Sequence, residues 1–325
     1  MRTYGGINEM ITLLPTYQSK YMDKKLPLVT IITNTKNRAR LISRCIESIQ
    51  NQTYQNYEHI VADGGTDNTK KIVESYNDPH IIYISIPEGG PVAQTKEAFK
   101  LSKGEFITFL DDDDEYTPEK LEKQLDLIQS LSDDYGFIYG AMTYYDNNTK
   151  EQLNIHGAEI EGGSEILPIA ISKPTICGTP TFMFRRKAFE SIGGTWISGI
   201  GNDMSDWALG CRALKQGWKV AALKESYLRI YVNHQATRMS DADFYKDNSQ
   251  RYIKFHNHFL SEYADIIAKN PKVGTFHYDN LVHFYVAAGR TGDAFKTWYK
   301  LIKTRPNFRS LVSFPYYFFR QLMKK

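Results

Sequence analysis

Five consecutive carboxylates follow an apolar segment of this chain and are its strongest candidates for chemistry. Residues 106–110 read FITFL, and residues 111–115 read DDDDE. Because adjacent carboxylates repel one another, such a cluster favours a bound cation. Hard divalent ions such as Mg²⁺ and Mn²⁺ suit carboxylate oxygens, and Mg²⁺ is commonly shared with the phosphates of a substrate. The run therefore predicts a site for a divalent cation and a phosphorylated ligand.

Two other interpretations of the acidic run fit the sequence less well. A solvated acidic turn is common for such runs, but this one directly follows a segment typical of a strand buried on both faces. If the run were a calcium-binding loop of the EF-hand type, acidic residues would stand at several of its ligand positions. That loop needs a glycine at its sixth position and a helix before it, whereas Tyr116 stands there and a strand precedes it.

Alternating strand and helix patterns place the acidic run at one edge of a sheet. Strands are expected at residues 28–33, 57–62, 81–86 and 106–110. A helix follows each strand, and the first one carries an apolar face at i, i+3, i+4 and i+7, made of Ile42, Cys45, Ile46 and Ile49. Such strand–helix units predict a mostly parallel sheet with helices on both sides. Ligands bind outside the carboxyl ends of parallel strands, which is where the acidic run lies.

Outside the acidic run, Asp63 ends the second expected strand and opens the turn 63–67 (DGGTD). Glycine permits close backbone approach, and the turn then caps a helix. No Gly-x-Gly-x-x-Gly follows the first strand and no Walker loop is present, so these two nucleotide-binding fingerprints are missing. We therefore expect Asp63 and residues 111–113 to bind the ligand. One carboxylate could bind a nucleoside, and the others could hold a metal–diphosphate.

The composition limits the classes of function. The 325 residues are 42% hydrophobic and 24% charged, as is usual for a soluble globular protein, and the net charge of +3 is too small to indicate a nucleic-acid partner. Three widely spaced cysteines show no zinc pattern and fit a reducing compartment. Residues 1–25 lack the apolar core of a signal peptide, and no apolar run reaches the ~20 residues that span a bilayer.

The chain is expected to divide into an N-terminal extension, an α/β domain and a helical C-terminal region. The three ranges are 1–26, 27–240 and 241–325. Within the α/β domain, residues 27–115 and residues 116–240 would form two halves.

The second half, residues 116–240, contains weaker signals. Thr117 followed by Pro118 is typical of a helix cap and a first helical position. Strands are expected at residues 135–145 and 179–186, and a helix is expected to start near Ser205.

Four segments, in order along the chain, resemble motifs of the family 2 glycosyltransferases, the inverting enzymes of the GT-A fold. Residues 34–38 (NTKNR) resemble the family's Pro-Thr-Tyr-Asn-Arg turn and keep its Thr, Asn and Arg. Residues 63–67 match its acidic-Gly-Ser-Thr-Asp turn. Residues 89–105 resemble its Gly-Gly-Gln segment, with Pro91 in place of Gln. Residues 109–114 (FLDDDD) match its Asp-x-Asp motif, the most diagnostic of the four.

The resemblance covers residues 27–240 and implies an α/β fold of the GT-A (Rossmann-like) type. It also implies that residues 27–115 are the nucleotide-binding half and residues 116–240 the acceptor half. A mostly parallel sheet flanked by helices would be followed by a helical C-terminal extension. The implied activity is that of a metal-dependent inverting glycosyltransferase of the hexosyltransferase type, with Mn²⁺ or Mg²⁺ as cofactor. The donor would be a nucleotide-diphosphate sugar, by default a UDP-sugar. The acceptor would be a hydroxyl of a saccharide or lipid-linked saccharide, in surface polysaccharide or glycan synthesis.

The resemblance also implies roles for individual residues. The implied donor-binding residues are Thr35, Asn37, Arg38, Asp63, Asp111 and Asp112. The implied metal ligands are Asp111, Asp113 and His234. The general base would be Asp206, which follows Ser205 where the family usually has Glu, and Asp203 is the alternative base. The helix dipole favours a carboxylate in a first helical turn, as at Asp206.

The C-terminal tail suggests a further partner. Residues 311–325 are aromatic and basic, a composition that can lie in an anionic membrane interface or pack on neighbouring helices. We therefore expect a cytoplasmic protein that can contact the cytoplasmic face of a membrane peripherally through this tail, and no nucleic-acid partner.

Two alternatives to sugar transfer stay open. A metal-dependent phosphatase would use Asp111 of the Asp-x-Asp motif as a covalent nucleophile. A catalytically inactive module would bind sugar nucleotides without turning them over, and the departures from the family motifs at Asn34, Lys96 and Ser205 are compatible with it.

Overall fold

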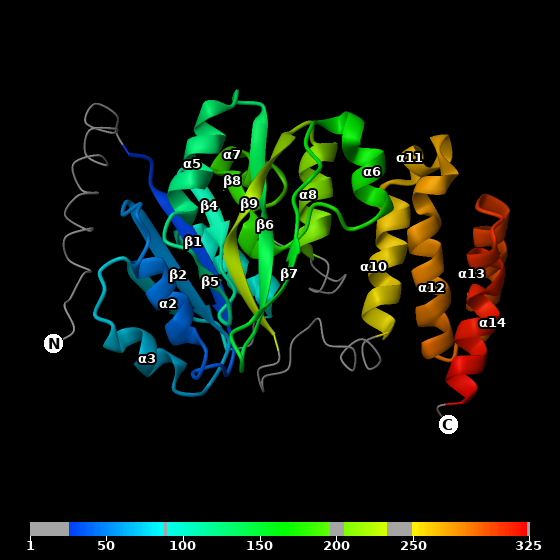
Figure 1. The fold of residues 1–325 in the computed structure, drawn as a ribbon, viewed down its shortest axis with the longest axis horizontal. Helices are drawn as coiled ribbons and strands as arrows, with labels where there is room; N and C mark the ends of the chain where they lie inside the picture. Colours follow the sequence, from blue (N-terminus) through cyan, green and yellow to red (C-terminus); the bar gives the residue numbers. More distant parts are fainter. Residues whose placement is uncertain (1–25, 88–89, 196–204, 233–248, 324–325) are drawn as a thin grey trace.

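The computed structural model describes residues 26–87, 90–195, 205–232 and 249–323. The expected N-terminal extension up to residue 25, the expected boundary near residue 240, and the candidate residues Asp203 and His234 lie outside these ranges. In Figure 1 a sheet with helices on both faces forms one part of the molecule, and a group of C-terminal helices lies beside it.

A single mixed sheet organises the α/β part of the chain. Its strands are β1 Val29–Thr35, β2 Tyr57–Asp63, β3 Ile81–Ser85, β4 Phe106–Phe109, β5 Glu115–Tyr116, β6 Tyr135–Asp146, β7 Gln152–His156, β8 Met183–Arg185 and β9 Lys219–Val232. They are ordered β3-β2-β1-β4-β8-β6-β9-β5, and β7 pairs with β6 outside this path. The first four strands in this order are parallel, as the sequence predicts, whereas β8 pairs with both β4 and β6 in antiparallel fashion.

Helices cover both faces of the sheet and continue beyond it (Figure 1). The helices up to residue 215 are α2 Ile42–Gln50, α3 Thr69–Ser75, α4 Pro91–Leu101, α5 Lys120–Ser130, α6 Leu167–Ser172, α7 Arg186–Ser191 and α8 Ser205–Lys215. The C-terminal group comprises α10 Ser249–Glu262, α11 Ala264–Lys269, α12 Thr275–Ala287, α13 Thr291–Thr304 and α14 Phe308–Leu322. The predicted strand at 135–145 and the predicted helix start at Ser205 are confirmed by β6 and α8.

Alternate side chains of the central strands enter two hydrophobic cores, because successive residues of a strand point to opposite faces of the sheet. Ile31 and Val61 pack on one face with residues of α2, α3 and α5. Ile32 and Ile60 pack on the other face with residues of α7, α8 and α10. All seven residues of β2 are buried. The predicted apolar face of α2 is also buried, and it consists of Ile42, Cys45, Ile46 and Ile49.

The first helix of the acceptor half begins later than its sequence predicts. Helix α5 starts at Lys120 with Glu119 as its N-cap, so the cap expected at Thr117 is wrong. The backbone N–H of Thr117 instead donates to the carbonyl of Tyr227 in β9, at 3.0 Å. Pairing with β9 therefore takes Thr117 and Pro118 out of the helix.

The strand expected at 179–186 is also only partly correct. Residues Thr179–Thr181 form a 3₁₀ turn, and only Met183–Arg185 pair as a strand. The Thr181 hydroxyl donates to the carbonyl of Gly178 at 2.7 Å, and such local bonds favour turns over strands. The sequence did not predict β9, because its residues (KVAALKESYLRIYV) alternate between polar and apolar only in part.

The C-terminal helices pack directly on α8 through Trp207. The Trp207 ring contacts Phe255 and Phe259 of α10 and stacks on His277 of α12, with ring centroids 5.3 Å apart. Its indole N–H donates to the carbonyl of Ala170 at 2.6 Å. Contacts on several sides of this ring hold α8 against the helical group.

Two buried histidines join α10 to α12 beside this contact. His277 Nε2 lies 2.9 Å from the carbonyl oxygen of Ile171, and because a carbonyl only accepts, this nitrogen carries the proton. The Nδ1 of His277 therefore accepts from the Nδ1 of His256, 2.9 Å away. Burial lowers the pKa of both rings, that of His277 to about 4, so both are neutral at neutral pH.

Replacing His277 with glutamine tests this neutral state. Folded His277 takes up a proton only near its lowered pKa of about 4, whereas an unfolded histidine does so near about pH 6.5. Wild-type stability is therefore lost as the pH falls through this window, and His277→Gln removes that loss. The difference in unfolding free energy between wild type and variant, measured in urea, should shrink by about 1.4 kcal/mol between about pH 7.5 and pH 5.5. A difference independent of pH would contradict the assignment.

Candidate active site

The order of the strands creates a switch point beside the acidic run. Strands β2 and β3 lie on one side of β1, and β4 lies on the other. In open α/β sheets, ligands bind at the carboxyl ends of the strands where the strand order reverses in this way. Thr35 ends β1, and residues 111–114 follow β4, so these predicted site residues meet at the switch point.

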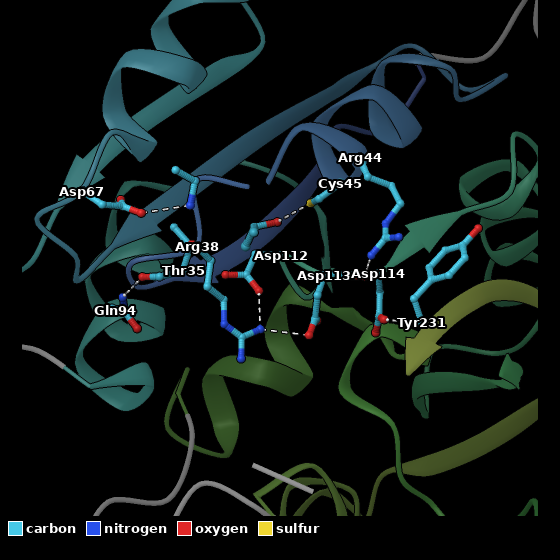
Figure 2. A network of polar contacts seen from close by, with 12 residues as sticks. Thr35, Arg38, Arg44, Cys45, Asp67, Gln94, Asp112, Asp113, Asp114 and Tyr231 are labelled. Carbon is cyan, nitrogen blue, oxygen red and sulfur yellow. Dashed lines mark hydrogen bonds and ion pairs between the residues drawn. The ribbon is translucent and has the colours of Figure 1, made fainter. Parts of the chain in front are cut away.

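Arg38 joins two of the aspartates at this point, as Figure 2 shows. Its Nη1 lies 3.0 Å from Asp112 Oδ1 and 2.9 Å from Asp113 Oδ2. The Arg38 side chain is 23% exposed, while those of Asp112 and Asp113 are 5% and 7% exposed. Burial raises the pKa of Asp112, Asp113 adds to the rise, and Arg38 opposes it. One guanidinium therefore compensates two neighbouring carboxylates that are largely withdrawn from water.

The other two aspartates of the run have different surroundings. Asp111 is exposed, whereas Asp114 is buried and its Oδ1 accepts from the backbone N–H of Tyr231 in β9, at 3.2 Å. Arg44 of α2 donates to the backbone carbonyl of Asp113 and lies over the Tyr231 ring, 3.9 Å from its centroid. These contacts tie the acidic run to α2 and β9 (Figure 2).

The turn after β1 and the turn after β2 are locked together. Asp63 is buried, and its carboxylate accepts from the Gly65 N–H at 2.6 Å and from the Tyr83 hydroxyl at 2.9 Å. Asn37 has a positive φ of 56°, and its side-chain oxygen accepts from the Thr66 N–H at 2.8 Å. A Cβ at Gly65 would lie 2.5 Å from the Asn37 backbone nitrogen, so only glycine permits this approach. The structure thus brings Asp63 and Asn37 together as a scaffold.

Gln94 of α4 is a site residue that sequence reasoning missed. Its Nε2 donates to the carbonyl of Thr35 at 2.8 Å (Figure 2). It also donates to the carbonyl of Ala62 at 3.1 Å, so Gln94 bridges the ends of β1 and β2. Gln94 lies one turn before Ala98 on the buried face of α4. A long amide among the buried positions of a helix is the signal that could have identified it, since such a group needs hydrogen-bond partners.

Asp206 supplies a carboxylate from a separate part of the chain. It lies in the first turn of α8, and its two oxygens accept from the backbone N–H groups of Gly178 at 2.5 Å and Trp207 at 2.7 Å. Burial raises the pKa of Asp206, and these hydrogen bonds partly offset the rise. Gly178 leads through the 3₁₀ turn to Phe182, whose carbonyl accepts from the Thr108 hydroxyl of β4 at 2.6 Å.

The oxygen donors of the acidic run suit a hard divalent cation. Among the residues described, no three His, Cys, Asp or Glu side chains gather as a complete ligand set. Mg²⁺ usually takes one or two carboxylates from the protein and the remaining ligands from phosphates and water. Asp111 and Asp113 fit that pattern, so these residues can hold a cation that is shared with a bound phosphate.

Comparison with known proteins points to one family. A family model described as "Glycosyl transferase family 2" matches residues 30–193, half of the chain. TuaG of Bacillus subtilis, named for teichuronic acid biosynthesis, is 29% identical over 204 residues, which is 61% of this chain and 77% of TuaG. A Campylobacter jejuni enzyme named GalNAc(5)-diNAcBac-PP-undecaprenol beta-1,3-glucosyltransferase is 32% identical over 147 residues. That match covers 43% of this chain and 46% of the relative, so the chain spans less than half of that protein.

Solved structures with the same fold include two sugar-nucleotide complexes. S. aureus TarS 1–349 in complex with UDP-GlcNAc has a TM-score of 0.58 at 16% identity, covering 91% of this chain and 92% of that one. Mannosyltransferase PcManGT from Pyrobaculum calidifontis in complex with GDP-Man and Mn²⁺ has a TM-score of 0.55 at 17% identity, covering 96% and 93%. At these identities the likeness concerns the fold alone.

Replacing Arg38 with glutamine tests how strongly the two aspartates depend on it. The variant removes the guanidinium that pairs with both nearly buried carboxylates, which should lower the free energy of unfolding by about 3 kcal/mol. Adding Asp112→Asn to Arg38→Gln should recover part of this loss, because one of the two negative charges is removed. Urea unfolding of the two single variants and the double variant measures both effects.

Arg186→Gln is the matched control for this measurement. The Arg186 side chain is similarly exposed at 25%, but its carboxylate partner, Glu190, is 54% exposed. The control should lose about 1 kcal/mol, mostly from the bond to the Gly104 carbonyl. Equal losses for Arg38→Gln and Arg186→Gln would contradict a special role for the Arg38 charge.

Proposed function

The chain belongs to glycosyl transferase family 2 and has the GT-A fold, and we propose that it is a metal-dependent inverting glycosyltransferase. In this proposal it moves a sugar from a nucleotide-diphosphate sugar to a hydroxyl. The observation that carries the proposal is the buried pair Asp112 and Asp113, held against Arg38 at the switch point of the parallel strands. Compensated charge at this place in an α/β sheet suits a diphosphate and its cation.

A UDP-sugar is the proposed donor. TarS, which shares the fold, has been solved with UDP-GlcNAc, and this supports UDP as the nucleotide. Asp63, at the end of β2, would bond the base. Thr35, Asn37 and Arg38 would border the nucleoside from the turn after β1, and Asp111 and Asp112 would lie near the ribose and the cation.

Mn²⁺ or Mg²⁺ would complete the donor site. Asp111 and Asp113 would hold the cation together with His234. When bound, the cation would neutralise the charge that develops on the departing diphosphate. Support comes from the oxygen ligands of the acidic run and from the Mn²⁺ in the PcManGT complex. Arg38 keeps the Asp113 carboxylate in place and adds a positive charge beside the diphosphate.

Asp206 is the proposed general base. Its carboxylate would accept the proton of the acceptor hydroxyl while that oxygen attacks the face of the anomeric carbon opposite the diphosphate. A raised pKa suits this role, because a base works best when its pKa approaches the working pH. The two backbone N–H groups that bind its oxygens fix the direction of the carboxylate.

A saccharide, free or linked to a lipid, is the proposed acceptor. The name of TuaG refers to teichuronic acid biosynthesis and that of the Campylobacter enzyme to a glycan linked to undecaprenol, and both support surface glycan synthesis. We propose that residues 27–115 bind the donor and that residues 116–240 bind the acceptor. Residues 241–325 would form a separate helical region. The proposed location is the cytoplasm, with peripheral contact at the cytoplasmic face of a membrane through residues 311–325.

Asp206→Asn separates binding from turnover. Asparagine cannot take the proton, so kcat should fall by about 10²- to 10⁴-fold, while the dissociation constant of the donor stays unchanged. Initial rates with a panel of saccharide acceptors and titration with UDP-GlcNAc measure the two quantities. A variant with near-normal kcat would move the base elsewhere, with Asp203 as the next candidate.

Asp293→Asn is the matched control for Asp206→Asn. Asp293 is likewise an acidic residue in the first turn of a helix, α13, but it pairs with Arg290 at the surface. This control should keep both kcat and donor binding. The limb of the wild-type pH profile on which kcat falls towards acid pH should also be absent in Asp206→Asn, since protonation of Asp206 would cause it.

A further inference from the structure

Helix α14 carries two opposite faces, and only one of them is packed. Ser310 and Ser313 are buried, and Phe314 and Tyr317 pack against the small core between α10, α12 and α13. The other face is an exposed apolar stripe made of Phe308, Leu311, Val312, Tyr316, Phe319, Leu322 and Met323. These positions recur every three or four residues, the spacing of one face of a helix. Phe308 is 80% exposed and Phe319 is 62% exposed, so the stripe is open to its surroundings.

Helix α13 carries two further exposed rings beside α14. Phe295 and Tyr299, one turn apart, are both about half exposed. The Phe295 ring contacts Phe314 of α14, with ring centroids 5.8 Å apart, so the exposed rings of α13 lie next to α14. Figure 1 places both helices at the outer end of the C-terminal group, away from the sheet.

The same part of the chain concentrates positive charge. Residues 290–325 contain nine Lys and Arg residues and one acidic residue, a net charge of +8, which leaves residues 1–289 with a net charge of −5. The exposed basic residues of the two helices include Lys296, Lys300, Lys303, Arg309 and Arg320. Arg309 and Arg320 follow stripe residues directly, so they lie along the edge of the stripe.

Aromatic residues beside basic ones are the combination that binds the interface of an anionic bilayer. The rings enter the boundary between headgroups and acyl chains, and the basic side chains meet the lipid phosphates. Within the described ranges, none of the helices has the length and apolar character that a membrane span requires. We propose that α13 and α14 bind the surface of an anionic lipid bilayer through this stripe and its basic edge.

A second copy of the chain fits this surface less well. Two such stripes packed face to face would bring two regions of net charge +8 together, and like charges oppose that association. A bilayer that contains acidic lipids offers an apolar layer and negative charge in the same place. This proposal is independent of the sugar-transfer chemistry, although it would also bring the donor site to any acceptor that is anchored in lipid.

Sedimentation with vesicles tests the proposal on the full chain. The protein should sediment with vesicles of phosphatidylcholine and phosphatidylglycerol, bind vesicles of phosphatidylcholine alone much more weakly, and be released by salt. Leu311→Gln with Phe319→Gln should lower the partition coefficient about tenfold or more, because two exposed apolar groups are lost. Lys296→Gln with Arg320→Gln should lower it by about one order of magnitude on anionic vesicles only.

Leu153→Gln with Ile155→Gln is the matched control. These two side chains are also more than half exposed, but they lie on β7, outside the C-terminal group. The control should sediment like the wild type. Wild-type sedimentation of the α14 variants, or equal binding of neutral and anionic vesicles, would overturn the proposal. A dimer in gel filtration that the α14 variants dissociate, without any change in vesicle binding, would show that a second copy occupies the stripe.

Discussion

The candidate site depends on a positive charge that compensates two negative charges buried away from water. Asp112 and Asp113 are adjacent in sequence and nearly buried, and together they would repel one another. Arg38 follows β1 and the aspartates follow β4, so only the parallel pairing of these two strands can bring the three side chains together. In the proposed function, a ligand that carries both a cation and phosphates would bind at this carboxyl end of the sheet, where ligands of open α/β sheets bind.

A second constraint concerns where the proposed base is held. Asp206 is fixed through Gly178 to the segment that leads into β8, the antiparallel neighbour of β4. On its other side, Trp207 is packed among rings of α10 and α12. The C-terminal helices thus support the helix that carries Asp206, although they lie far from the acidic run in the sequence. Their opposite surface, on α13 and α14, is available for a different contact.

The sequence was sufficient to predict the parallel half of the sheet and the place of the acidic run, because periodicity and residue type report burial directly. The roles given to Asp111, Asp112 and Asp113 rest on the family resemblance, because residue type alone does not distinguish four consecutive aspartates that differ only in their tertiary contacts. Asp114 binds the backbone of β9, a strand whose weak alternation concealed it. Gln94 was not predicted for a similar reason, because the carbonyls that it bridges come together only when β1 and β2 pair.

Calorimetric titration with nucleoside diphosphates tests the central claim most directly. The account predicts that UDP or GDP binds with an affinity at least about tenfold higher when Mn²⁺ or Mg²⁺ is present, because the cation joins the diphosphate to the carboxylates. Asp113→Asn should abolish that gain, whereas Asp134→Asn, a change to an aspartate whose partner is the exposed Lys219, should preserve it. The same affinity with and without either cation in the wild-type protein would contradict the account.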